Sequence, residues 1–412
     1  MTAARSPAAL VALFCTAEML SMAGFALAPS LLPEFSVQWG LSATDGGWLG
    51  GIFFLGYLMA VPVLVSLTDR IDARRIYLAC AALSGCALAG FGLLARGFES
   101  ALCWWWLAGV GLAGTYMPGL KALTDRLPVT AQSRGTAFYT ASFGVGAGLS
   151  YLWIEGVRRL TPLSGWPALF AVAALCAGLA ALLVHRAIAE RPAPRQPPIP
   201  QGRWRSVLRD RRILAFCGAY FGHNWELFGF RSWLVAYLVW MHGLAPDRWT
   251  AMPGLIAALA TFLAVPASIL GNEGAHRWGR SRWLNRVMPL SGGLALLLGL
   301  AVGQPAVLLV PLLLLYAVGM NLDSAALTAG LLTETPPEKR GAALALYSAI
   351  GFAGAFAGPV AFGIALDAFG RTSHAGWAAG FVTLAVGIGL GRRAIGGIAE
   401  ARRAETPETR LG

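Results

Sequence analysis

Charged residues are scarce in this chain of 412 residues. Asp, Glu, Lys and Arg make up 13% of it, whereas hydrophobic residues make up 57%. A soluble domain carries roughly 25% charged residues, so the composition excludes an ordinary soluble protein and favours a polytopic membrane protein. The sequence also lacks a P-loop or other nucleotide-binding motif, which excludes ATP as an energy source. No cofactor is expected.

Cysteines are few and follow no metal or disulfide spacing, since the six are scattered through apolar runs. Cys15, Met19 and Met22 recur at helical spacing, and soft sulfur ligands suit Cu(I). Ordinary packing is the simpler interpretation of this face, so no metal site is predicted. A cleavable signal peptide is not expected either, because the first apolar run is too long for one.

Twelve apolar runs are long enough to cross a bilayer, since about 20 apolar residues span its hydrocarbon core. They cover approximately residues 7–31, 47–67, 76–95, 101–124, 135–157, 165–186, 213–240, 250–271, 285–303, 305–330, 341–366 and 376–396. When the connecting segments are assigned alternately to two sides, 26 of the 32 lysines and arginines fall on one side and five on the other. The positive-inside rule then predicts a multi-pass inner-membrane protein with both termini in the cytoplasm. The net charge of +12 therefore reflects topology, and no nucleic-acid partner is expected.

The chain repeats itself at about half its length. Ala60-Val61-Pro62 recurs as Ala264-Val265-Pro266, and Arg134-Gly135 recurs as Arg340-Gly341. A proline-rich segment, residues 191–202, lies between the copies and is typical of a linker. We predict an all-α membrane protein with two pseudo-symmetric six-helix halves and a binding site between them. The N-terminal half covers residues 1–186, the cytoplasmic linker 187–212, the C-terminal half 213–396 and the cytoplasmic tail 397–412.

One loop motif carries a family resemblance. The segment between the second and third runs reads Leu67-Thr68-Asp69-Arg70-Ile71-Asp72-Ala73-Arg74-Arg75, and the segment from Gly271 to Arg280 echoes it in the second half. This loop resembles the Gly-x-x-x-Asp-Arg-x-Gly-Arg-Arg loop of the major facilitator superfamily. The resemblance covers nearly the whole chain and implies a twelve-helix transporter that works by alternating access.

The chain departs from the family pattern at several places. Val65 and Asp72 replace the two glycines of the loop motif. Trp105 stands near the position where many proton-coupled members carry an arginine, and the fifth run lacks the Gly-Pro pair of many drug antiporters. The missing pair argues against a drug exporter, and Trp105 leaves proton coupling open.

The resemblance implies that the loop is a cytoplasmic latch. Asp69 would accept hydrogen bonds from a helix N-terminus or from an arginine of a neighbouring helix. The arginines of both loops would complete the latch: Arg70, Arg74, Arg75, Arg277 and Arg280. Alternatively, these arginines only fix the topology against anionic lipid headgroups.

Ionisable residues inside the runs are the candidates for binding and coupling. Glu18 and Glu226 lie near the middle of the first and seventh runs, which are equivalent in the two halves. Such residues usually face a water-filled path or each other. The resemblance implies that both line the central cavity, and a buried carboxylate that can become neutral can carry a proton. The alternative is a structural carboxyl bonded to a neighbouring helix.

Two further candidates share the seventh run. His223 lies one turn before Glu226, so the two side chains share a helix face. Arg231 lies five residues after Glu226, about 140° away around a regular helix. Either this helix is unwound near Gly229, or Arg231 packs against another helix. Arg231 can serve either to bind an anionic substrate or to form an ion pair that gates the path. His223 can serve either as a ligand or proton carrier or as a simple packing residue.

The resemblance places two more spans beside the cavity. Asn321 and Asp323 lie in the tenth run, and Tyr116 lies in the equivalent part of the fourth. Lys121, close to Tyr116, is expected to extend to the headgroups.

These residues together predict a secondary transporter rather than an enzyme. We expect proton-coupled symport of a small polar solute, an organic acid or a zwitterion, by a monomer in the bilayer. One alternative is efflux of a hydrophobic cation neutralised by Glu18 and Glu226. The other is a receptor or scaffold that no longer transports. The absence of a soluble output domain argues against it.

Overall fold

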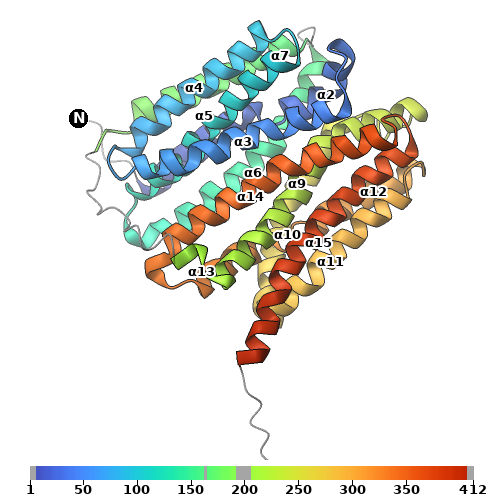
Figure 1. The fold of residues 1–412 in the computed structure, drawn as a ribbon. Coiled ribbons are helices and arrows are strands. Elements are labelled where there is room, and N and C mark those ends of the chain that lie inside the picture. The colour runs from blue at the N-terminus through green and yellow to red at the C-terminus, as the bar shows by residue number, and fades with distance from the viewer. Residues whose placement is uncertain (1–5, 162–164, 192–205, 406–412) are drawn as a thin grey trace, which may run out of the picture.

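The computed structural model describes residues 6–161, 165–191 and 206–405, and within these ranges the regular structure is entirely helical. The helices of the N-terminal half are α1 (Pro7–Ser21), η1 (Met22–Gly24), α2 (Leu27–Gln38), α3 (Ala43–Leu67), α4 (Ala73–Leu94), α5 (Phe98–Thr124), α6 (Val129–Leu160) and α7 (Trp166–Ala187). Those of the C-terminal half are α9 (Arg211–Leu244), α10 (Pro253–Trp278), α11 (Arg280–Leu300), α12 (Ala306–Gly319), α13 (Ser324–Glu334), η2 (Pro337–Lys339), α14 (Arg340–Phe369) and α15 (His374–Glu405). Figure 1 shows the two halves side by side, with α3 and α14 adjacent where they meet.

The helices agree with the predicted spans. Nine helical segments of the described chain are long and apolar enough to cross a membrane, counting α1–α2 and α12–α13 as one segment each. The other long helices, α5, α6 and α9, belong to the same bundle. Together they are consistent with twelve spans. The helices extend past the apolar runs at several ends, as in the first span, which continues to Gln38.

The first span is broken between α1 and α2. Ser150 of α6 occupies the break, because its hydroxyl accepts from the backbone N–H of Ala26 at 3.0 Å and donates to the carbonyl of Ala23 at 2.8 Å. The indole N–H of Trp153 donates to the same carbonyl at 2.9 Å. Backbone groups freed inside a membrane need such partners, so α6 stabilises this break.

The tenth span is broken between α12 and α13. The amide of Asn321 donates to the carbonyl of Ala317 at 2.8 Å, and the indole of Trp283 donates to the carbonyl of Leu322 at 2.9 Å. The seventh span, α9, is continuous instead of unwound near Gly229. A Cβ at Gly229 would lie 2.6 Å from the side chain of Leu384, so this glycine permits close packing rather than a break.

The halves meet mainly through two pairs of helices, α3 with α14 and α6 with α10, and α2 also contacts α9. A Cβ at Gly47 of α3 would lie 2.5 Å from the carbonyl oxygen of Pro359, and one at Gly363 of α14 would lie 2.2 Å from that of Ala43. The two backbones therefore approach closely near the start of α3 and the end of α14. Farther along, the rings of Tyr57 and Phe352 are 4.1 Å apart between centroids.

Two sides of the bundle are distinguished below by their basic residues. The arginine-rich side carries the loops with Arg70–Arg75 and Arg277–Arg286. The arginine-poor side carries the starts of α3 and α10 and the ends of α6 and α14. The close glycine contacts lie toward the arginine-poor side.

Candidate transport site between the two halves

Glu18 is the buried carboxylate of the N-terminal half. Its side chain is fully buried on α1, one turn before the break. Oε2 accepts from the hydroxyl of Tyr139 at 3.0 Å, and Oε1 has no hydrogen-bond partner in the described chain. The same hydroxyl lies 3.1 Å and 3.2 Å from the carbonyl oxygens of Thr115 and Tyr116. A phenol has one O–H proton and can donate only one hydrogen bond at a time. When Glu18 is protonated, its own O–H donates to Tyr139, and the Tyr139 O–H is then free to donate to one of these carbonyls.

Glu226 is the buried carboxylate of the C-terminal half. Oε1 accepts from Ser291 of α11 at 2.5 Å and from Tyr316 of α12 at 3.0 Å. Oε2 is buried without a hydrogen-bond partner in the described chain. Glu226 therefore faces the interior of its own half, and Glu18 is likewise bonded within its own half. The two carboxylates do not share hydrogen-bond partners.

His223 and Asp323 form a second buried group beside Glu226. The break after α12 places Asp323 within reach of α9, and His223 Nδ1 lies 2.7 Å from Asp323 Oδ1. Both side chains are almost inaccessible to solvent. Neither atom has a partner with hydrogen-bond geometry, so the contact is close but poorly aligned. One side of the imidazole stacks on Tyr220, which stacks in turn on Tyr347.

Arg231 lies between the halves. Its guanidinium carbon is 5.8 Å from the centre of the Phe228 ring, and its carbonyl accepts from Tyr151 of α6 at 3.4 Å. It lines a small cavity with residues of both halves, including Pro29 of α2 and Gly50 of α3. Within the described residues no carboxylate pairs with Arg231. Arg231 is half-buried, and a guanidinium partly removed from water favours an anionic partner. In this conformation the cavity has a volume of only about 10 Å³, which is room for one water at most.

One carboxylate–arginine pair joins the halves at the end of α6. Glu155 and Arg159 form an ion pair with each other, and both contact the start of α10. Glu155 Oε2 accepts from the backbone N–H of Gly254 at 3.1 Å, and Arg159 donates to the carbonyl of Ala251. This group, the α6 clamp, places a negative charge at the N-terminus of a helix in the other half, where it is favourable.

The end of α14 carries the counterpart, the α14 clamp. Asp367 accepts from the backbone N–H groups of Ala43 at 3.0 Å and Thr44 at 2.7 Å, at the start of α3. Arg371 pairs with Asp367 and donates to the carbonyl of Leu41 at 2.6 Å. The acid and the arginine of this clamp each lie 212 positions after their counterparts in the α6 clamp, so the clamps follow the internal repeat. Both lie on the arginine-poor side and join the two halves there.

The predicted latch loop is bonded within the N-terminal half. In the described chain the side chain of Asp69 has no hydrogen-bond or ion-pair partner, and Arg70 is exposed. Asp72 is the carboxylate that makes the contacts: it pairs with Arg126 at 2.9 Å and accepts from the backbone N–H of Arg191 at 2.7 Å. Burial raises the pKa of Asp72, but these hydrogen bonds and that of the Arg74 N–H outweigh burial, so the pKa is lowered.

The other latch arginines also have local partners. Arg74 donates to the carbonyl of His185 at 2.8 Å, and Arg75 pairs with Glu190 at 2.7 Å. These contacts tie the end of α7 to the α3–α4 loop. Arg280 donates to Thr333 at 3.2 Å, whereas Arg277 lies over the ring of Trp278. The role of the loop as a latch between the halves stays a prediction.

The structure thus brings some predicted residues together and separates others. Glu226, His223 and Asp323 form one buried region, while Glu18 with Tyr116 and Tyr139 forms another. Three partners of these acids were missed in the sequence: Tyr139, Ser291 and Tyr316. Single hydroxyls inside apolar runs give no pattern that distinguishes them from packing residues. Lys121 pairs with Asp125 at 3.0 Å.

The remaining candidates of this region have modest roles in the structure. Asn321 bonds its own helix at the break, and Tyr116 stacks on Tyr139 with ring centroids 5.8 Å apart. Met22 belongs to the 3₁₀ turn after α1, so it does not extend the face of Cys15 and Met19 as a regular helix would. Within the described residues no group of three His, Cys, Asp or Glu could hold a metal ion.

Comparison with known proteins supplies the family. A model of the Major Facilitator Superfamily matches residues 14–332. No curated protein matches the sequence.

Several solved structures share the fold. A bacterial homologue of the human lysosomal transporter Spinster, in an inward-facing and occupied conformation, is 15% identical with a TM-score of 0.79, over 97% of this chain and 98% of that chain. The nucleoside transporter NupG is 12% identical with a TM-score of 0.76, over 95% and 99%. The POT family transporter PepTSo has the same identity and TM-score, over 98% and 99%. At these identities the likeness shows the fold alone.

Proposed function

The chain belongs to the Major Facilitator Superfamily and is a transporter rather than an enzyme, and from that premise we propose that it moves a small organic acid or zwitterion together with protons. Transport takes place by alternating access, with the solute held between the halves. The cargo class rests on Arg231, whose guanidinium lines the cavity between the halves without a carboxylate partner in the described chain. A carboxylate of the solute would supply the missing charge through paired hydrogen bonds.

Proton coupling rests on the buried acids, and Glu226 is the observation that carries it. Its side chain is fully buried, and Oε2 has no partner in the described chain. An unpaired charge there is costly, whereas a neutral carboxyl is tolerated. His223 lies one turn before Glu226 on α9, and Asp323 lies 2.7 Å from His223, so two further ionisable groups stand beside Glu226. Movement that admits water to this region would allow Glu226 to release its proton.

The positions of the clamps and of the basic residues together indicate which conformation of the transport cycle this structure represents. The α6 and α14 clamps lie on the arginine-poor side, which the positive-inside rule assigns to the periplasm. We infer that the structure represents the transporter closed toward the periplasm, in the inner membrane, with both termini in the cytoplasm. Opening toward the periplasm requires both clamps to separate.

Uptake into proteoliposomes tests the proposal. Candidate organic acids and amino acids are first selected by thermal shift of the purified protein, and their uptake is then measured with and without an inward proton gradient. Gradient-driven accumulation of an anionic or zwitterionic solute is the expected result. Gradient-driven exclusion of a hydrophobic cation would favour efflux. Binding without any flux would favour a receptor.

A further inference from the structure

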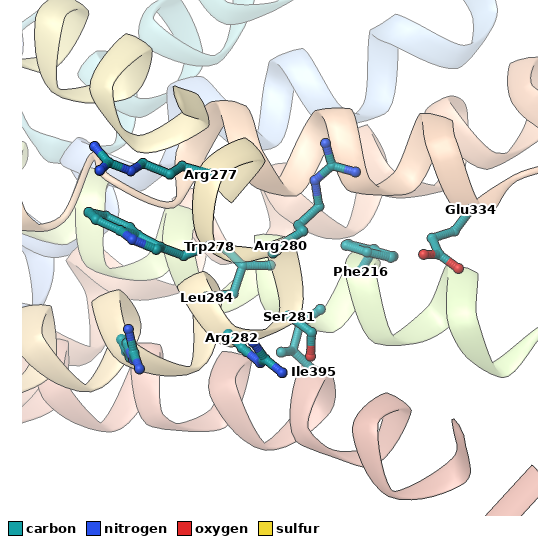
Figure 2. A pocket seen from close by; sticks show the side chains of 11 residues that line it. Phe216, Arg277, Trp278, Arg280, Ser281, Arg282, Leu284, Glu334 and Ile395 are labelled. Carbon is teal, nitrogen blue, oxygen red and sulfur yellow. The ribbon is translucent and has the colours of Figure 1, made fainter. Parts of the chain in front are cut away.

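A separate cavity lies on the arginine-rich side of the C-terminal half. It surrounds the turn between α10 and α11 and has a volume of about 600 Å³, within the range of small-molecule sites. Its basic residues are Arg277, Arg280, Arg282 and Arg286. Figure 2 shows the labelled arginine side chains leaving this turn in different directions, with Phe216 between Arg280 and Glu334. The cavity is distinct from the region between the halves.

The positive charge of this cavity is not balanced. None of its four arginines pairs with a carboxylate among the described residues. The one acid of the lining, Glu334, lies 3.9 Å from Arg212. The Nε of Arg280 is buried and has no hydrogen-bond partner in the described chain. A buried guanidinium donor without an acceptor is unfavourable, so this position favours an anionic acceptor.

The backbone adds to the same field. Gly279 joins α10 directly to α11 with φ of +84°, a conformation that favours glycine. The first turn of α11 then begins at the cavity, and it contains no acidic residue and no side-chain cap. The free N–H groups and the helix dipole at such a start attract anions. Together with four guanidinium groups, this arrangement is typical of phosphate recognition.

Apart from Ser281, Gly279 and Glu334, the rest of the lining is apolar. Phe216, Leu284 and Ile395 form apolar walls. Trp278 is 48% exposed and stacks on Trp283 with centroids 5.2 Å apart. Tryptophans of this kind mark the headgroup level of a membrane. A ligand here would meet positive charge at its head and apolar surface beside it.

We propose that this cavity binds the phosphate of an anionic phospholipid headgroup. Basic pockets between membrane helices on the cytoplasmic side are suited to such headgroups. The phosphate would lie near the start of α11 and accept from Arg280 and Arg282, while the acyl chains follow the apolar walls. A free phosphate compound shares the phosphate chemistry but would leave the apolar walls unused.

Native mass spectrometry and thermal shift test this site, with phosphatidylglycerol, phosphatidylcholine and inorganic phosphate as separate additions. The test variant is Arg282→Gln with Arg286→Gln. The matched control is Arg134→Gln with Arg186→Gln, since all four side chains are exposed and lie on the same side. We expect phosphatidylglycerol to bind the wild type and the control, and to bind the test variant about tenfold more weakly. Binding should also weaken as salt is raised.

Three results would overturn the proposal. Equal loss in both double variants would mean general attraction to the charged surface. Equal binding of phosphatidylcholine would mean that the site does not distinguish an anionic headgroup from a zwitterionic one. Stabilisation by inorganic phosphate, lost in the test variant and not increased by phosphatidylglycerol, would replace the lipid by a free phosphate compound.

Discussion

Glu226 is the single residue on which proton coupling is expected to depend. Glu226→Gln keeps the volume and the acceptor for Ser291 and Tyr316 but cannot release a proton. We expect gradient-driven accumulation to fall to the background level, while exchange of solute across the membrane survives. Uptake after a pH jump, measured beside counterflow in the same proteoliposomes, distinguishes the two activities.

The exposed Glu99 of α5 offers a matched control, because Glu99→Gln makes the same chemical change away from the buried acids. Wild-type accumulation by Glu226→Gln would show that this carboxyl is structural, and Asp323 would be the next candidate. Glu18→Gln is expected to alter solute affinity more than coupling, because Glu18 bonds to Tyr139 beside Tyr116.

Arg231 is expected to determine the charge of the solute. Arg231→Gln removes the guanidinium from the cavity between the halves, so the half-saturation concentration of an anionic solute should rise about tenfold or more. Arg231→Lys should recover only part of the affinity, since an ammonium cannot form the paired hydrogen bonds of a guanidinium. Arg248→Gln is the control, because Arg248 is exposed and lies over the ring of Trp249. An unchanged half-saturation concentration in Arg231→Gln would assign Arg231 to packing.

At the scale of helices, the two clamps are expected to hold the arginine-poor side closed. Asp367→Asn removes the charge that faces the start of α3, and Glu155→Gln does the same at α10. Losing a carboxylate at a helix N-terminus costs about 1 kcal/mol. Each variant should therefore increase opening on this side several-fold, and the double variant should increase it further.

The clamp measurement uses a cysteine in place of Ser232, which is buried and lines the small cavity beside Arg231, in a background without the native cysteines. Its labelling by a reagent added from the arginine-poor side should be faster in both single variants. Glu34→Gln is the control, because Glu34 pairs with Arg158 inside its own half. Unchanged labelling in the double variant would mean that the clamps do not contribute to closure and that helix packing closes this side.

Gly363 tests the contribution of that packing. A Cβ at this position would lie 2.2 Å from the carbonyl oxygen of Ala43, so Gly363→Val must push α14 away from α3. We expect faster labelling on the arginine-poor side and slower transport, because closure is required in each cycle. Gly156→Val is the control, since no atom lies within 4 Å of a Cβ there. Normal transport by Gly363→Val would mean that the two helices separate at little cost.

The elements show which features the sequence could predict. Apolar runs located the spans because the bilayer imposes their length and polarity. The breaks could not be located in the same way, because they depend on partners from other helices, as Ser150 does for the first span. The clamps did have a signal: Glu155 with Arg159 and Asp367 with Arg371 repeat an acid four residues before an arginine at equivalent helix ends. By sequence alone, however, arginines so close to the membrane surface indicate only topology.

For the whole molecule, the remaining prediction is orientation. Of the 32 lysines and arginines, 26 fall on one side, and anionic lipids together with the insertion machinery retain such segments in the cytoplasm. We expect the linker, which lies largely outside the described residues, and both termini to be cytoplasmic. In a background without the native cysteines, an impermeant reagent applied to intact cells should label a cysteine at Ser42 and spare one at Gln196. Labelling both sites after the cells are opened is the control for reactivity. The reverse pattern in intact cells would place the clamps in the cytoplasm, and the structure would then represent the transporter closed toward the inside of the cell.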